Sequence, residues 1–150
     1  MIGARVPHTP EDEVLLELAR TVVGVSAAAA DRLGGVSLVQ LRALTVLRRL
    51  GTATLGDLAS GMGVTVSTTS RLVDRLVAAG LVLREPAPHS RRELALQMTA
   101  SGQALLDRFD EDRLVALRAA LRGVTDQDAV LAAFTAFSAA MRPTEPAVAS

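Results

Sequence analysis

Residues 64–80 read VTVSTTSRLVDRLVAAG, and the order of residue types along this stretch decides the fold. Its second half is amphipathic: Thr69, Leu72, Val73 and Leu76 fall on one stripe of a helix. Its first half consists of Thr, Val and Ser residues, which are weak helix formers. Either this half is a loop, or its short side chains are needed for contacts outside the helix.

The residues before this stretch predict a second, shorter helix and a tight turn. Thr54 is typical of an N-cap, and a short helix is expected from Leu55 to about Ser60. Gly61-Met62-Gly63 then predicts a turn. Thr65 caps the helix that follows and Gly80 ends it, so the two helices form a helix-turn-helix.

The residues after Gly80 change from helical to alternating periodicity. Residues 81–84 predict an extended segment, and the prolines within residues 86–91 predict a loop. From residue 92 to 98, Leu94, Leu96 and Met98 alternate with other side chains, as in a half-buried strand. A β-hairpin, or wing, is therefore expected next to the helix-turn-helix.

Longer helices are expected on both sides of this unit. Thr9-Pro10 predicts a helix start and Gly34-Gly35 its end, and Ser37 with Gln40 forms a capping box for a helix that ends at Gly51. A long helix is expected from Ala100 to about Arg122, with Thr99 as its cap. The last helix is expected to begin at the caps Thr125 and Asp128 and to run to Arg142. The fold class is therefore mainly α with a small β-hairpin wing, a winged helix-turn-helix with flanking dimerisation helices.

The final helical segment also predicts dimerisation on physical grounds. The sequence AVLAAFTAFSAAM is rich in Ala and Phe nearly all round a helix. A helix of this kind needs cover on most sides, which a partner subunit supplies.

Composition excludes several functions. The chain has 150 residues, two His, three Phe and no Cys, Trp or Tyr, so disulfides, thiolate metal sites and thiol redox chemistry are excluded. The acidic cluster at residues 110–113 is expected to spread around a helix surface. We therefore expect no enzyme, no catalytic residues, no cofactor and no metal site. The chain shows neither a signal peptide nor an 18-residue apolar run, which predicts a cytoplasmic protein without membrane contact.

The charge distribution points to nucleic acid although the net charge is zero. Residues 37–63 carry +2 and residues 64–92 carry +3, whereas the two ends together carry −5. Every basic side chain besides histidine is Arg, whose planar fork suits phosphates and guanine edges.

The weak helix start is then explained by DNA binding. In a helix-turn-helix the first turns of the second helix enter the major groove, where short hydroxyl side chains let the backbone approach the bases. Arg at a wing tip is suited to the minor groove. The predicted DNA-binding residues are Thr65, Ser67, Thr68, Ser70, Arg71, Arg75, Arg91 and Arg92.

Three segments resemble the MarR family of bacterial transcriptional regulators. They are SLVQLRALTVL, LGDLASGMGVTVSTTSRLVDRLVAAGLVLR and SRRELALQMTASGQAL, and the resemblance covers about residues 10–142. It implies a winged-helix homodimer whose first, fifth and sixth helices form the interface. It also implies that Arg71 and Arg75 lie on the recognition helix and that Arg92 matches the characteristic wing arginine. Ser90 stands where the family usually has Asp, so a neutral hydrogen bond replaces the charge pair that orients this arginine.

Together these observations predict a sequence-specific DNA-binding transcriptional regulator. We expect residues 1–150 to form a single MarR-like chain. In it, residues 37–98 bind double-stranded DNA, and the helices within residues 10–36 and 99–142 form the interface of a homodimer. We expect a repressor on a palindromic operator, modulated by a small-molecule effector in an aliphatic-lined cavity. The alternative is a winged-helix protein-interaction module that does not bind DNA.

Overall fold

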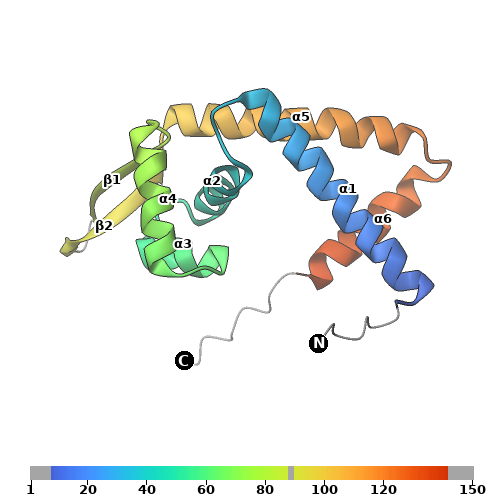
Figure 1. Cartoon of the computed structure of the whole chain (residues 1–150), viewed down its shortest axis with the longest axis horizontal. Helices are drawn as coiled ribbons and strands as arrows, with labels where there is room; N and C mark the ends of the chain where they lie inside the picture. Colours follow the sequence, from blue (N-terminus) through green and yellow to red (C-terminus); the bar gives the residue numbers. More distant parts are fainter. Residues whose placement is uncertain (1–7, 88–89, 142–150) are drawn as a thin grey trace, which may run out of the picture. The chain divides into compact units, whose positions relative to one another are not determined.

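The computed structural model describes residues 8–87 and 90–141, with the backbone alone for residues 90–93. The chain divides into two compact units, Met1–Leu114 and Val115–Ser150. The elements in chain order are α1 (Pro10–Leu33), α2 (Leu38–Leu50), α3 (Leu55–Met62), α4 (Val66–Ala78), β1 (Val82–Ala87), β2 (Ser90–Met98), α5 (Ala100–Arg122) and α6 (Gln127–Ala140). Within the described residues, six helices and one hairpin confirm the predicted mainly α fold with a winged helix-turn-helix (Figure 1).

The predicted helix starts in the first unit are confirmed by side-chain hydrogen bonds to the backbone. Thr9, Ser37 and Thr54 each accept from the backbone N–H three residues on, and each belongs to a full capping box. In the third box the backbone N–H and hydroxyl of Thr54 both donate to Asp57, at 2.9 and 2.7 Å. These two bonds hold the pKa of the Asp57 carboxyl below its ordinary value.

The predicted end of α3 and the predicted start of α6 were wrong by one or two residues. Helix α3 continues through Gly61 to Met62, because only Gly63 adopts the left-handed conformation that ends a helix, with φ +68°. Helix α6 is capped by Asp126, whose carboxylate accepts from the backbone N–H of Ala129 at 3.0 Å, and not by Thr125 and Asp128. The predicted end of α6 at Arg142 lies outside the described residues.

The hairpin is longer than predicted. Pro86 and Ala87 belong to β1, and Ser90 and Arg91 to β2, where a loop was expected. Proline excludes helix but is tolerated on an edge strand, where one side has no ladder to donate to. Among the residues that the structure describes, β1 pairs only with β2, whereas Leu96 of β2 also pairs with Ala53 through backbone bonds of 3.1 and 2.7 Å.

The predicted alternation along β2 was only partly right. Leu96 is buried and Met98 half-buried, but Leu94 is 52% exposed. Leu94 pairs with Pro86 near the outer end of the hairpin, whereas Leu96 lies beside Ala53 at the core. Burial along this strand therefore follows distance from the core as well as the face of the sheet.

The core of the first unit is built almost entirely from aliphatic side chains, as the composition predicts. It joins α2, α3, α4, the hairpin and the first turns of α5 with Ala29 and Ala30 near the end of α1 (Figure 1). The largest fully buried side chains are Leu41, Leu44, Leu47, Leu58, Leu76, Leu96, Leu106, Val73, Val82 and Thr69. This core holds both helices of the helix-turn-helix and the root of the wing.

Helix α6, in the second unit, has no buried residue. Its exposed apolar side chains include Leu131, Phe134 and Phe137. Within the described residues, no single helix has both the length and the apolar character to cross a membrane; α1 and α2, bent by 99°, meet those criteria only as a pair.

Candidate nucleic-acid interface

The second half of α4 anchors the helix in the core. Leu72, Val73 and Leu76 are buried, and the Thr69 hydroxyl donates to the Thr65 carbonyl at 3.0 Å, which satisfies the one polar side chain on this stripe. The predicted buried stripe is therefore confirmed. Opposite the stripe, the side chains are exposed: Ser67, Arg71, Asp74, Arg75 and Ala78.

The first turn of α4 carries a connected group of exposed hydroxyls. The Thr65 hydroxyl accepts from the backbone N–H of Thr68 at 3.3 Å, which makes Thr65 the N-cap. It also lies 3.0 Å from the Thr68 hydroxyl and 3.2 Å from the Ser67 hydroxyl. Of the other predicted residues, Ser70 is half-buried and is thus less accessible than expected.

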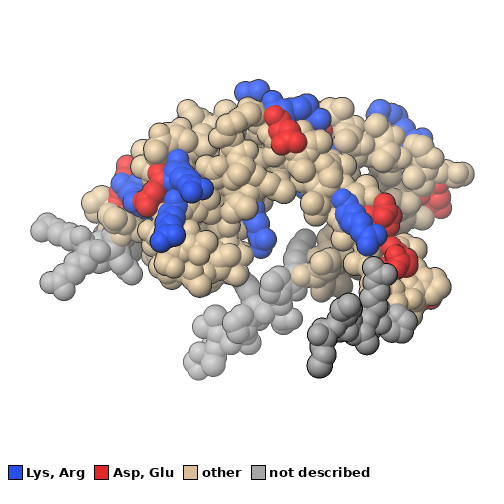
Figure 2. All heavy atoms as spheres, viewed as in Figure 1, with Lys and Arg blue, Asp and Glu red and all other residues tan. Residues whose placement is uncertain are grey.

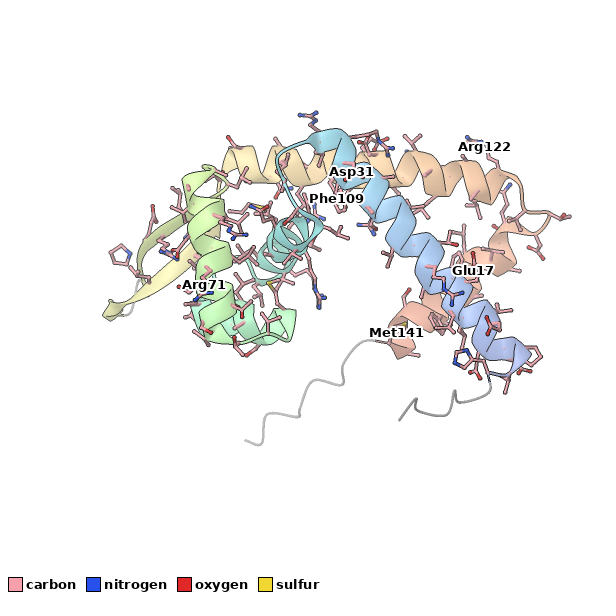
Figure 3. All side chains as sticks on the ribbon, viewed as in Figure 1. Glu17, Asp31, Arg71, Phe109, Arg122 and Met141 are labelled. Carbon is pink, nitrogen blue, oxygen red and sulfur yellow. The ribbon has the colours of Figure 1, made fainter. Side chains whose placement is uncertain are left out.

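The two arginines on α4 are exposed and unpaired. Neither Arg71 nor Arg75 has a hydrogen bond or ion pair with the part of the chain that the structure describes. Arg71 lies on α4 (Figure 3), and Figure 2 shows basic side chains on the surface over this helix, with an acidic side chain beside them. Two free guanidinium groups thus lie on the same exposed face as the hydroxyls.

The acidic residue on this face is paired with the wing. The Asp74 carboxylate lies 2.7 Å from the Arg84 guanidinium of β1. This contact offsets a negative charge on an otherwise basic and hydroxyl-bearing face, and it joins the recognition helix to the hairpin. The sequence could not show it, because the two residues lie on different elements.

The wing arginines are placed only in part. Arg91 and Arg92 lie on β2 by their backbone, near the end of the hairpin that is distant from Ala53, and their side chains lie outside the described residues. The structure thus brings Thr65, Ser67, Thr68, Arg71 and Arg75 together on one helix and puts the two wing arginines on the neighbouring hairpin.

A cavity in the first unit contains functional candidates that the sequence analysis did not identify. It has a volume of about 260 Å³ and is lined by Val22, Val23, Ser26, Leu38, Arg42, Thr45, Phe109 and Arg113. The aliphatic residues were expected of an effector cavity, but Phe109 (Figure 3) and the two arginines were not. Arg42 donates to the Met62 carbonyl at 3.2 Å, at the end of α3.

Arg113 has an unusual environment in this cavity. Its guanidinium lies 5.0 Å from the centre of the Phe109 ring, and its Nε is buried without a hydrogen-bond partner among the described residues. Its Nη1 lies 3.5 Å from the Asp110 carboxylate. No group of three His, Cys, Asp or Glu within residues 8–87 and 90–141 could hold a metal ion.

Two helices joined by a left-handed glycine turn and followed by a hairpin define a winged helix-turn-helix protein. Comparison with known proteins gives the family. Residues 36–94 match the sequence profile of the MarR family. The crystal structure of RV1404 from Mycobacterium tuberculosis is 30% identical, covers 93% of this chain and 99% of that one, and superposes with a TM-score of 0.80. The chain belongs to the MarR family of winged-helix transcriptional regulators.

Two curated relatives match part of the chain. The HTH-type transcriptional regulator YcgE of Bacillus subtilis is 35% identical over 91 residues, which cover 60% of this chain and 58% of the relative. The HTH-type transcriptional repressor NicR of Pseudomonas putida is 36% identical over 69 residues, which cover 46% of this chain and 44% of the relative. The chain spans about half the length of the curated relatives that it matches.

Proposed function

We propose that this regulator binds double-stranded DNA sequence-specifically through residues 37–98, as a homodimeric repressor on a palindromic operator. The observation that carries the proposal is the exposed first half of α4, where hydroxyls and two unpaired arginines share one face opposite a fully buried stripe. In this arrangement α4 enters the major groove, and Arg91 and Arg92 of the wing contact the backbone or minor groove. Repression, rather than activation, is proposed by analogy with NicR, which is named as a transcriptional repressor.

The hydroxyl group at the tip of α4 supports this role in a second way. Thr65, Ser67 and Thr68 bond to one another and to the helix start, so their side chains are held in place before DNA arrives. Hydroxyls both donate and accept, so they can meet either a phosphate or a base edge. The helix N-terminus adds backbone N–H donors and the positive end of its dipole.

Selection of bound duplexes from a random pool, followed by titration at several salt concentrations, tests the proposal. Binding through phosphates must weaken steeply with salt because counterions are released. Arg71→Ala or Arg75→Ala should weaken binding to the selected duplex by about 1–3 kcal/mol if a base contact is lost. The matched control is Arg122→Ala, which removes the same charge from the exposed end of α5.

Three results would contradict DNA binding by this face. One is the absence of any enriched duplex, which would favour a protein-interaction module. Another is an affinity that does not change with salt. The third is an equal effect of Arg71→Ala, Arg75→Ala and Arg122→Ala, because general charge, rather than the face of α4, would then explain binding.

The dimer is proposed because a single chain exposes many apolar side chains to solvent. Every residue of α6 is at least partly exposed, including Phe134 and Phe137, and so are Val14 and Leu15 of α1. Exposed apolar side chains within residues 10–36 and 99–142 therefore supply the proposed interface, and a two-fold dimer suits half-sites about 34–36 Å apart. Light scattering should give a dimer that Phe137→Glu dissociates, whereas Val39→Glu, at the more exposed Val39 of α2, should not. A monomeric wild-type chain at micromolar concentration would refute the dimer.

An effector site is proposed from the cavity that contains Arg42 and Arg113. Its apolar walls, the unsatisfied Nε of Arg113 and a second guanidinium suit an apolar organic anion. An anion that attracts Arg42 competes with the Met62 carbonyl, and so acts on the helix end that precedes the turn into α4. Such a shift would change the spacing of two recognition helices in a dimer and lower DNA affinity.

Benzoate is a suitable probe of this cavity because it combines an apolar ring with a carboxylate. It should raise the unfolding temperature of the wild-type chain in a concentration-dependent way. Arg113→Met should abolish the shift in unfolding temperature, because methionine replaces the aliphatic part of the side chain but lacks the unsatisfied Nε donor. Arg122→Met should leave the shift unchanged. An identical shift in wild type and Arg113→Met would refute the role of Arg113.

A further inference from the structure

Val66 is the one apolar side chain in the first turn of α4, where Ser67, Thr68 and Thr69 follow it. Val66 is the first residue of the helix and is 53% exposed. It follows Thr65 and precedes Ser67 and Thr68, and it is not part of the hydrophobic core. Valine is a weak helix former, so neither helix propensity nor burial explains why an apolar side chain lies at this position.

Position along the helix places Val66 next to the polar row of α4. Residues three, four and seven apart share one side of a helix, so Ser67 and Arg71 form one polar row. Val66 lies between that row and the buried stripe, because Thr69 and Val73 are three and seven residues further on. The exposed end of α4 therefore presents a polar row beside one branched apolar side chain. A surface meant only for phosphates would not need that apolar side chain.

The major groove offers one apolar group that such a side chain can contact. Adenine, guanine and cytosine are distinguished there by hydrogen-bond donors and acceptors, whereas thymine also carries a C5-methyl group. Small apolar side chains contact this methyl group and exclude water from it.

We propose that Val66 is a specificity-determining residue that packs against the C5-methyl group of a thymine in each half-site. The inference rests on the proposed entry of α4 into the major groove and adds a base preference to it. Ser67, Thr68 and Arg71 then recognise polar base edges or phosphates nearby, while Val66 distinguishes thymine from cytosine and uracil at one position.

Uracil substitution provides the test, because deoxyuridine differs from thymidine only by the absence of the methyl group. The full chain selects duplexes from a random pool, and the tightest duplex is resynthesised with deoxyuridine in place of each thymidine in turn, in both half-sites together. At one position, affinity measured by fluorescence anisotropy should fall about fourfold per half-site, the effect expected for one buried methyl group. At the other positions the substitution should change affinity little.

The Val66→Ala variant must then lose this discrimination. Its affinities for the thymidine and deoxyuridine duplexes should be equal at the sensitive position. Val39→Ala is the matched control, since Val39 is 56% exposed near the start of α2, and it should retain the wild-type ratio. Val66→Thr keeps the branched shape and one methyl group, so it should retain a preference for thymidine over deoxyuridine. Circular dichroism shows whether each variant is folded.

The outcomes separate this inference from the proposed function. A selected duplex that shows no deoxyuridine-sensitive position, or that contains no thymine in its protected half-sites, overturns the role of Val66 but leaves DNA binding intact. Discrimination that persists in Val66→Ala also overturns it. Failure to select any duplex overturns both the proposed function and this inference.

Discussion

Gly102, in the first turn of α5, leaves no room for a Cβ atom beside the Leu81 backbone, and replacing it with Ala should strongly destabilise the protein. A Cβ atom on Gly102 would lie 2.3 Å from the Leu81 carbonyl oxygen and 2.8 Å from Cγ of Met98. The Met98 side chain can rotate away, but the carbonyl belongs to the backbone between α4 and β1. To reach ordinary van der Waals distance, the start of α5 must move by about 1 Å.

That movement would break hydrogen bonds that join α5 to the helix-turn-helix. The Leu81 carbonyl accepts from the backbone N–H of Thr99 at 3.0 Å, and the Thr99 hydroxyl donates to the Gly80 carbonyl at 2.7 Å. Overpacking typically costs about 1–3 kcal/mol, and each lost hydrogen bond about 1 kcal/mol more. Gly102→Ala should therefore lower the free energy of unfolding by roughly 2–5 kcal/mol.

Urea unfolding followed by circular dichroism, at one fixed protein concentration, measures this loss. The matched control is Gly56→Ala in α3, where the added Cβ would meet only the Thr54 hydroxyl, at 3.7 Å. This control should be neutral or more stable by up to about 1 kcal/mol, because Ala is the better helix former. If Gly102→Ala matches Gly56→Ala in stability, the close approach of α5 to Leu81 is incorrect.

Three further predictions concern the helix-turn-helix. Asp57→Ala should lower the free energy of unfolding at pH 7, because hydrogen bonds from Thr54 lower the pKa of the Asp57 carboxyl and so stabilise its charged form. In urea titrations the difference from wild type should shrink as the pH falls through this lowered pKa, and a difference that grew in acid would contradict the sign. Leu76→Ala should cost about 2–5 kcal/mol in the same assay because Leu76 is fully buried, and a loss below 1 kcal/mol would contradict that burial. Asp74→Asn should cost less than about 1 kcal/mol because its ion pair with Arg84 is half-exposed, and a larger loss would mean that the pair is shielded from solvent.

The helix starts could be predicted from the sequence because their causes are local. A cap at Thr9, Ser37, Thr54 or Thr65 depends on the backbone within three residues, and the hydrogen bonds are those that the residue types imply. The buried stripe of α4 was also predictable, since its spacing is a property of the helix itself.

Contacts between distant residues could not be predicted in this way. Ala53 pairs with Leu96, Arg42 with the Met62 carbonyl and Asp74 with Arg84, and none of these pairs leaves a periodic signal. The close approach of Gly102 to Leu81 is of the same kind. A glycine three residues after a helix cap was visible in the sequence, but the carbonyl that requires it was not.

The hairpin shows how a correct local rule can give a wrong boundary. Proline does exclude helix at Pro86, yet an edge strand tolerates it, and only the pairing of β2 with Ala53 shows that β1 is the edge. The exposure of Leu94 has a related cause, because the core ends before the strand does. Strand limits thus depend on what lies beside the strand.

The weak start of α4 is stable because the two halves of the helix have different tasks. Leu72, Val73 and Leu76 anchor the second half, and the Leu81 backbone N–H donates to the Leu76 carbonyl at 2.9 Å where the chain leaves the helix. The first half adds little burial beyond Thr69, so its residues contribute mainly through the Thr65 cap. Substitutions at exposed positions of the tip, such as Val66 and Ser67, should therefore change stability by only a few tenths of a kcal/mol. The proposed base preference of this helix can consequently change while its core stays intact, and this separation explains why the hydroxyl-bearing residues of α4 all lie in its first half.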